Sequence, residues 1–157
     1  MKQTLFSRSA IVMALALSVA PTLVRAQDVQ RCSNATSAGR WGFTTNGVLI
    51  LPTGPVPVTA VGHFVQDLHG NMEGSQVRSL GGGVAHETFT GTVTTNADCT
   101  GKYTINVYDD SGNLVRISVL DAVFTNGGRK ARVVFESIVL PNGASLPSVL
   151  SIDGDKL

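Results

Sequence analysis

Two carboxylates, Asp121 and Glu136, lie on strand-like segments that otherwise look buried. If side chains alternate between faces, Asp121 shares a face with two valines, and Glu136 shares one with Val134 and Ile138. A buried carboxylate is costly unless it is paired or hydrogen-bonded. Each of the two therefore requires a partner.

The candidate partners are Arg116 and Arg132. One interpretation is a cross-strand ion pair at the rim or on the outer wall of a barrel. The other is a polar anchor inside a lumen, where burial would suit the carboxylate to proton transfer. Arg116 is also a candidate ligand-binding residue.

The histidines and aromatic residues supply further candidates. His63 and His86 lie mid-strand, where they could face one cavity as acid and base, or simply be exposed or satisfied in the core. His69 lies in a turn and is expected to be solvated. Trp41 and Phe43 could floor a ligand cavity or fill the core, which aromatic side chains commonly dominate.

Familiar catalytic and metal-binding motifs are missing from the sequence. It has no G-x-S-x-G elbow, and the three glycines at 81–83 lack the Lys-Ser/Thr and the helix of a phosphate-binding loop. No histidine or cysteine pair has metal-ligand spacing. We therefore expect no metal and no cofactor, and the glycines are predicted to form a turn.

Residues 1–26 have the pattern of a secretory signal peptide. Basic residues precede an apolar run at 10–20, and Val24 and Ala26 supply small residues before the expected cleavage site. The run is shorter than the roughly 20 residues of a membrane span, which disfavours the alternative of a retained anchor. The sequence predicts export to the periplasm or outside the cell, with one mature domain at 27–157.

The mature chain is mildly acidic. Removal of Lys2, Arg8 and Arg25 leaves nine basic and eleven acidic residues, a formal charge of −2. No Lys/Arg cluster remains, so the sequence offers no electrostatic footprint for nucleic acid or anionic lipid. We expect neither as a partner, and no integral membrane segment after signal removal.

The chain contains two cysteines, Cys32 and Cys99. In an oxidising compartment, two cysteines without a third most simply form one disulfide. The bridge would tie the mature N-terminus to a turn between two strands and contribute about 4 kcal/mol in the chain-entropy model.

Strand-like runs alternate with turn signals from Trp41 onward, and no segment has the spacing of an amphipathic helix. The connections are short and rich in Gly, Asn, Asp or Pro, which favours antiparallel neighbours. The predicted fold is all-β: an antiparallel meander of about eight strands closed into a small β-barrel, with a β-sandwich as the alternative. The predicted strands are 41–51, 58–68, 72–80, 84–95, 102–108, 114–125, 130–140 and 149–153.

The later strands are apolar on both faces, unlike 102–108, where Tyr103, Ile105 and Val107 share one side. Something must then cover their second face: the N-terminal segment, the tail after Pro141, or another protomer. A homo-oligomer is therefore one hypothesis.

Three stretches carry a family resemblance: CSNATSAGRWGFTTNG at 32–47, AVGHFVQDLHGNMEGS at 60–75 and FTGTVTTNADCTGKYTI at 89–105. They are similar to a layout in a largely uncharacterised family of small exported bacterial proteins. In that layout a Cys precedes G-x-[YW]-G-F, a V-G-x-[FI] strand with a D-x-x-G-N turn follows, and F-x-G-T-[YV]-x-x-N-x-D-C-T-G comes last. Family members resemble β-barrels of the calycin or allene oxide cyclase type.

The resemblance covers most of the mature chain, and its D-C-T-G turn is fairly specific. It implies a barrel, export and pairing of Cys32 with Cys99. Val93 departs from the layout, since an aromatic is commoner there, and this concerns packing alone. The resemblance supplies no catalytic residues.

The sequence supports three hypotheses of function. The first is an exported, non-catalytic barrel with a binding or structural role, which could hold one small apolar ligand. The second is a cofactor-free cyclase-like or isomerase-like enzyme that uses Glu136, Asp121, His63 or His86 in a cavity. The third is a subunit of a secreted homo-oligomeric assembly.

Overall fold

The computed structural model of the protein describes residues 31–157. The predicted signal peptide, residues 1–26, lies outside these described residues. Within the described part of the chain, no helix has the length and apolar character needed to cross a membrane.

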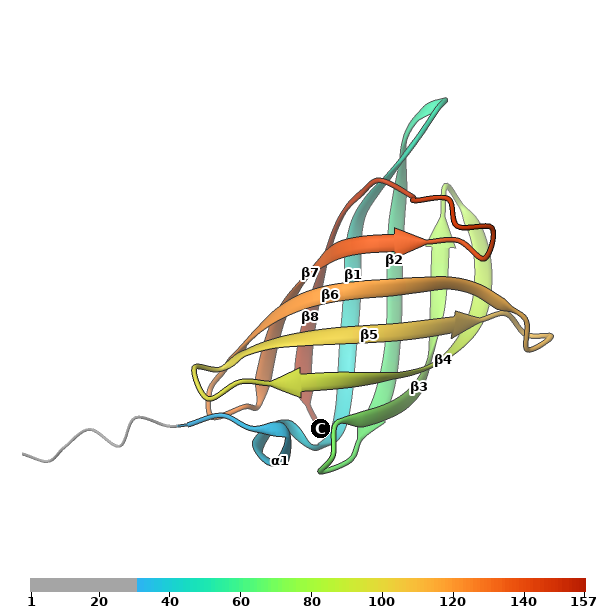
Figure 1. The fold of residues 1–157 in the computed structure, drawn as a ribbon. Coiled ribbons are helices and arrows are strands. Elements are labelled where there is room, and N and C mark those ends of the chain that lie inside the picture. Colours follow the sequence, from blue (N-terminus) through green and yellow to red (C-terminus); the bar gives the residue numbers. More distant parts are fainter. Residues whose placement is uncertain (1–30) are drawn as a thin grey trace, which may run out of the picture.

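Eight antiparallel strands follow a short helix, α1, and close into a barrel (Figure 1). The elements are α1 (Asn34–Ser37), β1 (Gly39–Leu51), β2 (Gly54–Gln66), β3 (Asn71–Leu80), β4 (Gly83–Thr95), β5 (Thr100–Tyr108), β6 (Leu114–Thr125), β7 (Lys130–Val139) and β8 (Ser148–Lys156). Each strand pairs with the next in sequence, and β8 returns to pair with β1. The predicted barrel is confirmed, and the alternative sandwich is not formed.

The hairpin of β1 and β2 is longer than predicted, because β2 begins at Gly54 rather than at residue 58. Pro55 and Pro57 pair with β1, although the sequence had placed them in a turn. Proline cannot donate a backbone hydrogen bond and is tolerated where a strand has one neighbour. Pairing of β2 with β3 starts only at Val58, so both prolines lie where the strand ladder of β2 has β1 alone as its neighbour. The tip of this hairpin projects beyond the other strands (Figure 1).

A β-bulge in β7 changes the face on which the following side chains lie. Phe135 is opposite Leu120 and Ser137 is opposite Val119, so Glu136 is an extra residue in the ladder. One extra residue reverses the alternation of a strand. Glu136 is therefore exposed, whereas Ile138 is buried, and the prediction that these two share a face was wrong.

One end of the barrel, here called the closed end, is covered by α1 and by the disulfide between Cys32 and Cys99. A capping box at Ser33 begins α1. The carbonyl of Ser37 accepts a hydrogen bond from Trp41 Nε1 at 2.8 Å, and its hydroxyl accepts one from Gln66 Nε2 at 2.8 Å. The predicted disulfide is confirmed, and it holds the chain before α1 against the turn between β4 and β5.

Aromatic side chains fill the barrel next to the closed end. Trp41 stacks on Phe64 with ring centroids 6.0 Å apart, and Phe43 meets Phe89 edge-on at 5.9 Å. Glycine makes room for these rings: a Cβ on Gly62 would lie 2.6 Å from Cζ of Phe43. Contacts of this kind between aromatic rings stabilise a core beyond the area that they bury.

The outer wall retains exposed apolar side chains on the later strands. Val123 is 49% exposed and Val134 is 55% exposed. Among residues 31–157, neither α1 nor the chain after Pro141 covers them. Residues 27–30 of the predicted N-terminal cover lie outside the described residues. Coverage by another protomer stays a prediction.

Candidate ligand-binding site in the barrel lumen

Two cavities lie inside the barrel, one behind the other. The inner chamber, of about 70 Å³, lies among the aromatic rings and is lined by Trp41, Phe43 and Tyr103, among others. The outer chamber, of about 270 Å³, lies at the opposite end from α1, here called the open end. Its apolar walls come from seven strands and the β7–β8 connection: Leu49, Val58, Ala60, Leu80, Ala85, Val115, Phe135, Ile138, Leu140, Leu146 and Leu150.

The connection between β7 and β8 builds one side of the outer chamber. The ladder between these strands ends where Val134 pairs with Ser151. Beyond that point the connection takes the place of β8, and the backbone N–H of Leu146 donates to the carbonyl of Ile138 at 2.8 Å. This places the Leu146 side chain in the chamber wall.

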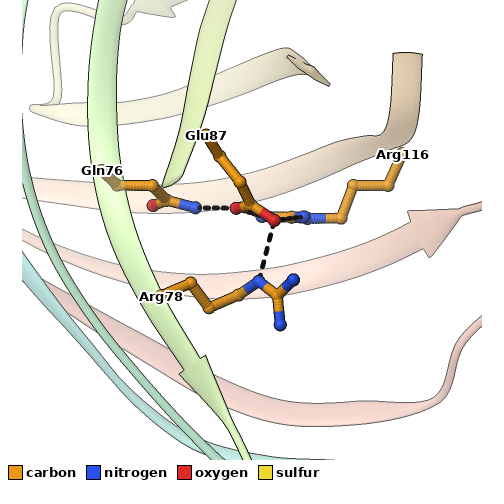
Figure 2. Close-up of polar contacts among 4 residues, drawn as sticks. All are labelled: Gln76, Arg78, Glu87 and Arg116. Atoms are coloured by element: carbon orange, nitrogen blue, oxygen red, sulfur yellow. Dashed lines mark hydrogen bonds and ion pairs between the residues drawn. The ribbon is translucent and has the colours of Figure 1, made fainter. Parts of the chain in front are cut away.

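Four polar side chains, here called the Glu87 cluster, form the floor of the outer chamber (Figure 2). Arg116 donates from both terminal nitrogens to the two carboxylate oxygens of Glu87, at 2.8 and 2.7 Å. Arg78 donates from Nε to Glu87 Oε1 at 2.9 Å, and Gln76 donates from Nε2 to Oε2 at 2.7 Å. The Glu87 side chain is only 3% exposed, so it depends on these donors.

Strand geometry brings the cluster together. Gln76 lies opposite Glu87 in the ladder between β3 and β4, and Arg78 is two residues further along β3, on the same face. Arg116 reaches Glu87 from β6, which is not a neighbour of β4 in the sheet. The closure of the barrel is what allows this contact across the lumen.

The charge of Glu87 is stabilised despite its burial. Burial alone raises the pKa of Glu87, but hydrogen bonds and charge from Arg116, followed by hydrogen bonds from Gln76 and Arg78, outweigh it. The resulting pKa is about 2, below the ordinary value of 4.5. Glu87 is therefore ionised at neutral pH and cannot donate a proton there.

The hydroxyl of Ser118 faces the inner chamber and has no hydrogen-bond partner among residues 31–157. Ser118 is 2% exposed. It lies two residues after Arg116 on the inner face of β6 and lines the inner chamber. Its hydroxyl is available to a polar atom of a ligand.

The structure places Asp121 and Glu136 on the outer wall of the barrel. Both carboxylates bind Lys102, with Asp121 Oδ1 at 2.9 Å from its Nζ. The arrangement is the cross-strand ion pair on the outer wall, but neither expected arginine is involved. Arg132 binds Asp153 instead, at 2.7 Å, and Arg116 points into the lumen.

The two histidine candidates do not share a cavity. His63 is exposed on β2, next to the inward-facing Phe64. His86 is exposed on β4 and borders the outer chamber. Trp41 and Phe43 are buried in the core, and both also line the inner chamber. A role of these two residues in ligand binding stays a prediction.

Sequence reasoning found Arg116 but missed Glu87, Gln76 and Arg78. The signal was present in β4, where Glu87 lies two residues before Phe89 and so shares its face, between polar neighbours. The partners could not have been found in this way, because they depend on which strands the barrel brings together. In residues 31–157 no three histidine, cysteine or acidic side chains gather as metal ligands.

No protein-family model matches the chain, and no curated protein sequence is similar to it.

Proposed function

We propose that the protein is an exported, non-catalytic barrel that binds one small apolar ligand in the outer chamber. The observation that carries this proposal is a chamber of about 270 Å³ with apolar walls, at one end of a barrel whose other end is closed. Ligand sites are concave and mostly apolar, with a few polar groups that orient the ligand. The Glu87 cluster supplies such groups at the chamber floor.

The distribution of side-chain size supports binding at this end. Trp41, Phe64 and Phe124 occupy the closed half, where little space remains. Smaller side chains, among them Val58 and Ala60, line the outer chamber. An eight-stranded barrel can be filled by side chains or can hold one ligand, and this barrel combines the two.

A binding role is favoured over the cyclase-like or isomerase-like alternative. The alternative needs a lumen group that exchanges a proton near neutral pH. Asp121, Glu136 and His63 lie on the outside, and the low pKa of Glu87 makes it a weak base and no acid. The remaining candidate, His86, borders the outer chamber but is exposed and lies outside the Glu87 cluster.

Export is part of the proposal. The disulfide between Cys32 and Cys99 supports it, because such bridges persist in oxidising compartments. Membership of the family of small exported bacterial barrels is likewise proposed, on the D-C-T-G turn and the strand motifs of the sequence.

Binding of the neutral fluorescent dye N-phenyl-1-naphthylamine tests the proposal. Val58→Trp fills the outer chamber, whereas Val61→Trp places the same ring on the outer wall, where Val61 is 59% exposed. We expect the dye to bind the wild type and Val61→Trp alike, and to bind Val58→Trp at least tenfold more weakly. Equal binding by all three, or no binding by the wild type, would contradict the proposal.

A further inference from the structure

The floor of the outer chamber carries more positive than negative charge. Arg78 and Arg116 each carry a full positive charge, and Glu87 neutralises one of them. Asp109 also borders the chamber and is half-buried, but its carboxylate accepts hydrogen bonds from Ser111 and Asn113 in its own turn. The two arginines share one carboxylate, so the Glu87 cluster carries one positive charge in excess.

The spare charge belongs to Arg78 when the hydrogen bonds are assigned. Both terminal nitrogens of Arg116 bind Glu87, whereas Arg78 binds it through Nε alone (Figure 2). Among residues 31–157, no group accepts a hydrogen bond from the two terminal nitrogens of Arg78. The Arg78 side chain is 21% exposed and lines the outer chamber but not the inner one.

We infer that the ligand of the outer chamber is an apolar monocarboxylate, whose carboxylate binds the two terminal nitrogens of Arg78. This inference rests on the proposed function and names the chemical class of its ligand. The planar fork of a guanidinium matches the two oxygens of a carboxylate, and such charge-assisted pairs are the stronger hydrogen bonds. Glu87 holds the guanidinium of Arg78 in position by accepting a hydrogen bond from Nε, which leaves the two terminal nitrogens facing away from Glu87.

The dimensions of the chamber limit the apolar part of the ligand. The volume of the chamber, about 270 Å³, lies just below the range of roughly 300–1,000 Å³ that is usual for ligand pockets, so its ligand is small. A linear chain of eight carbons fits this space with its carboxylate at the floor. Its tail would contact Leu49, Ile138 and Leu150 in the chamber wall.

Competition between octanoate and 1-octanol tests the inference. The two probes share a chain length and differ in charge, and each is titrated against bound N-phenyl-1-naphthylamine. We expect octanoate to displace the dye from the wild type at a concentration at least tenfold lower than 1-octanol. In Arg78→Met this ratio falls to near one, and in Arg78→Lys, which keeps the charge but loses the fork, it takes an intermediate value.

Arg132→Met is the matched control, because Arg132 is an arginine on the outer wall whose partner is Asp153. It should keep the wild-type ratio. If Arg78→Met kept the wild-type preference for octanoate over 1-octanol, Arg78 would not be the residue that binds the carboxylate. A wild type that prefers 1-octanol, or that does not distinguish the probes, would overturn the carboxylate while leaving the proposed function intact. If the dye itself does not bind, the proposed function fails as well.

Discussion

The two ends of the barrel are built from the same eight strands but are filled in opposite ways. At the closed end, α1, the disulfide and a cluster of aromatic rings leave little space. At the open end, smaller apolar side chains surround a chamber whose floor is an ion pair with an extra arginine. The comparison shows that a closed sheet fixes the outline of the interior, while side-chain size and charge decide what occupies it.

The difference also separates stability from binding. The disulfide and the aromatic rings of the closed end, such as Trp41 and Phe64, stabilise the fold without lining the outer chamber. The Glu87 cluster is different, since a buried ion pair gains little over apolar packing and becomes costly once a partner is lost. Apolar side chains at the chamber floor would serve stability as well, so the cluster supports the proposed binding role.

Reduction of the disulfide should give the largest loss of stability while sparing the open end. Cys32 and Cys99 are 67 residues apart in sequence, and loss of the cross-link is expected to lower the free energy of unfolding by about 4 kcal/mol. Urea unfolding of oxidised and reduced protein measures this loss. Dye binding by the folded fraction should change less than threefold, and a parallel loss of dye affinity would show that the two ends are not separable.

Replacement of Glu87 by glutamine should destabilise the open end by about 3 kcal/mol, because two arginines then share the lumen without an anion. The loss should shrink in Glu87→Gln/Arg116→Met, where one of the unpaired charges is also removed. Urea unfolding of the three proteins at neutral pH provides the comparison. If Glu87→Gln were as stable as the wild type, the charge of Glu87 would make no contribution to the stability of the fold.

Protonation of Glu87 in acid should lower the stability of the protein by a similar amount. The pKa of Glu87 is about 2 in the folded protein against an ordinary 4.5, so its contribution is complete above pH 4.5 and disappears as the pH falls towards 2. The shift corresponds to about 3 kcal/mol. Stability of the wild type relative to Glu87→Gln, measured by urea unfolding between pH 7 and 2, should converge over this window. Parallel curves would contradict the assigned pKa.

The smallest effect is expected on the outer wall, at the ion pairs of Lys102. The side chains of Lys102, Asp121 and Glu136 are about half exposed, so solvent screens their attraction. Lys102→Met should leave the urea midpoint and dye binding unchanged within error. A loss as large as that of Glu87→Gln would erase the distinction between the lumen and the outer wall.

Much of the fold could be predicted from local chemistry. Glycine, asparagine, aspartate and proline mark most of the turns, which gave the strand order and hence the barrel. The presence of only two cysteines, together with the predicted export, was enough to pair Cys32 with Cys99. These inferences succeed because each depends on residues near one another in sequence or on a single possible pairing.

The site was less predictable because it depends on the closure of the sheet and on an irregularity. Arg116 and Glu87 meet across the lumen from strands that are not neighbours. The bulge at Glu136 reverses the alternation that had grouped it with Ile138. The alternation of side chains along a strand also does not predict that Lys102, on β5, binds both Asp121 on β6 and Glu136 on β7.

Methyl-resolved NMR of the oxidised protein during a titration with octanoate tests the central claim most directly. The account predicts shifts for Leu49, Ile138 and Leu150, which line the outer chamber, and none for Val61 and Val134 on the outer wall. Shifts confined to the outer valines, or no shifts at saturating octanoate, would contradict a ligand site at the open end.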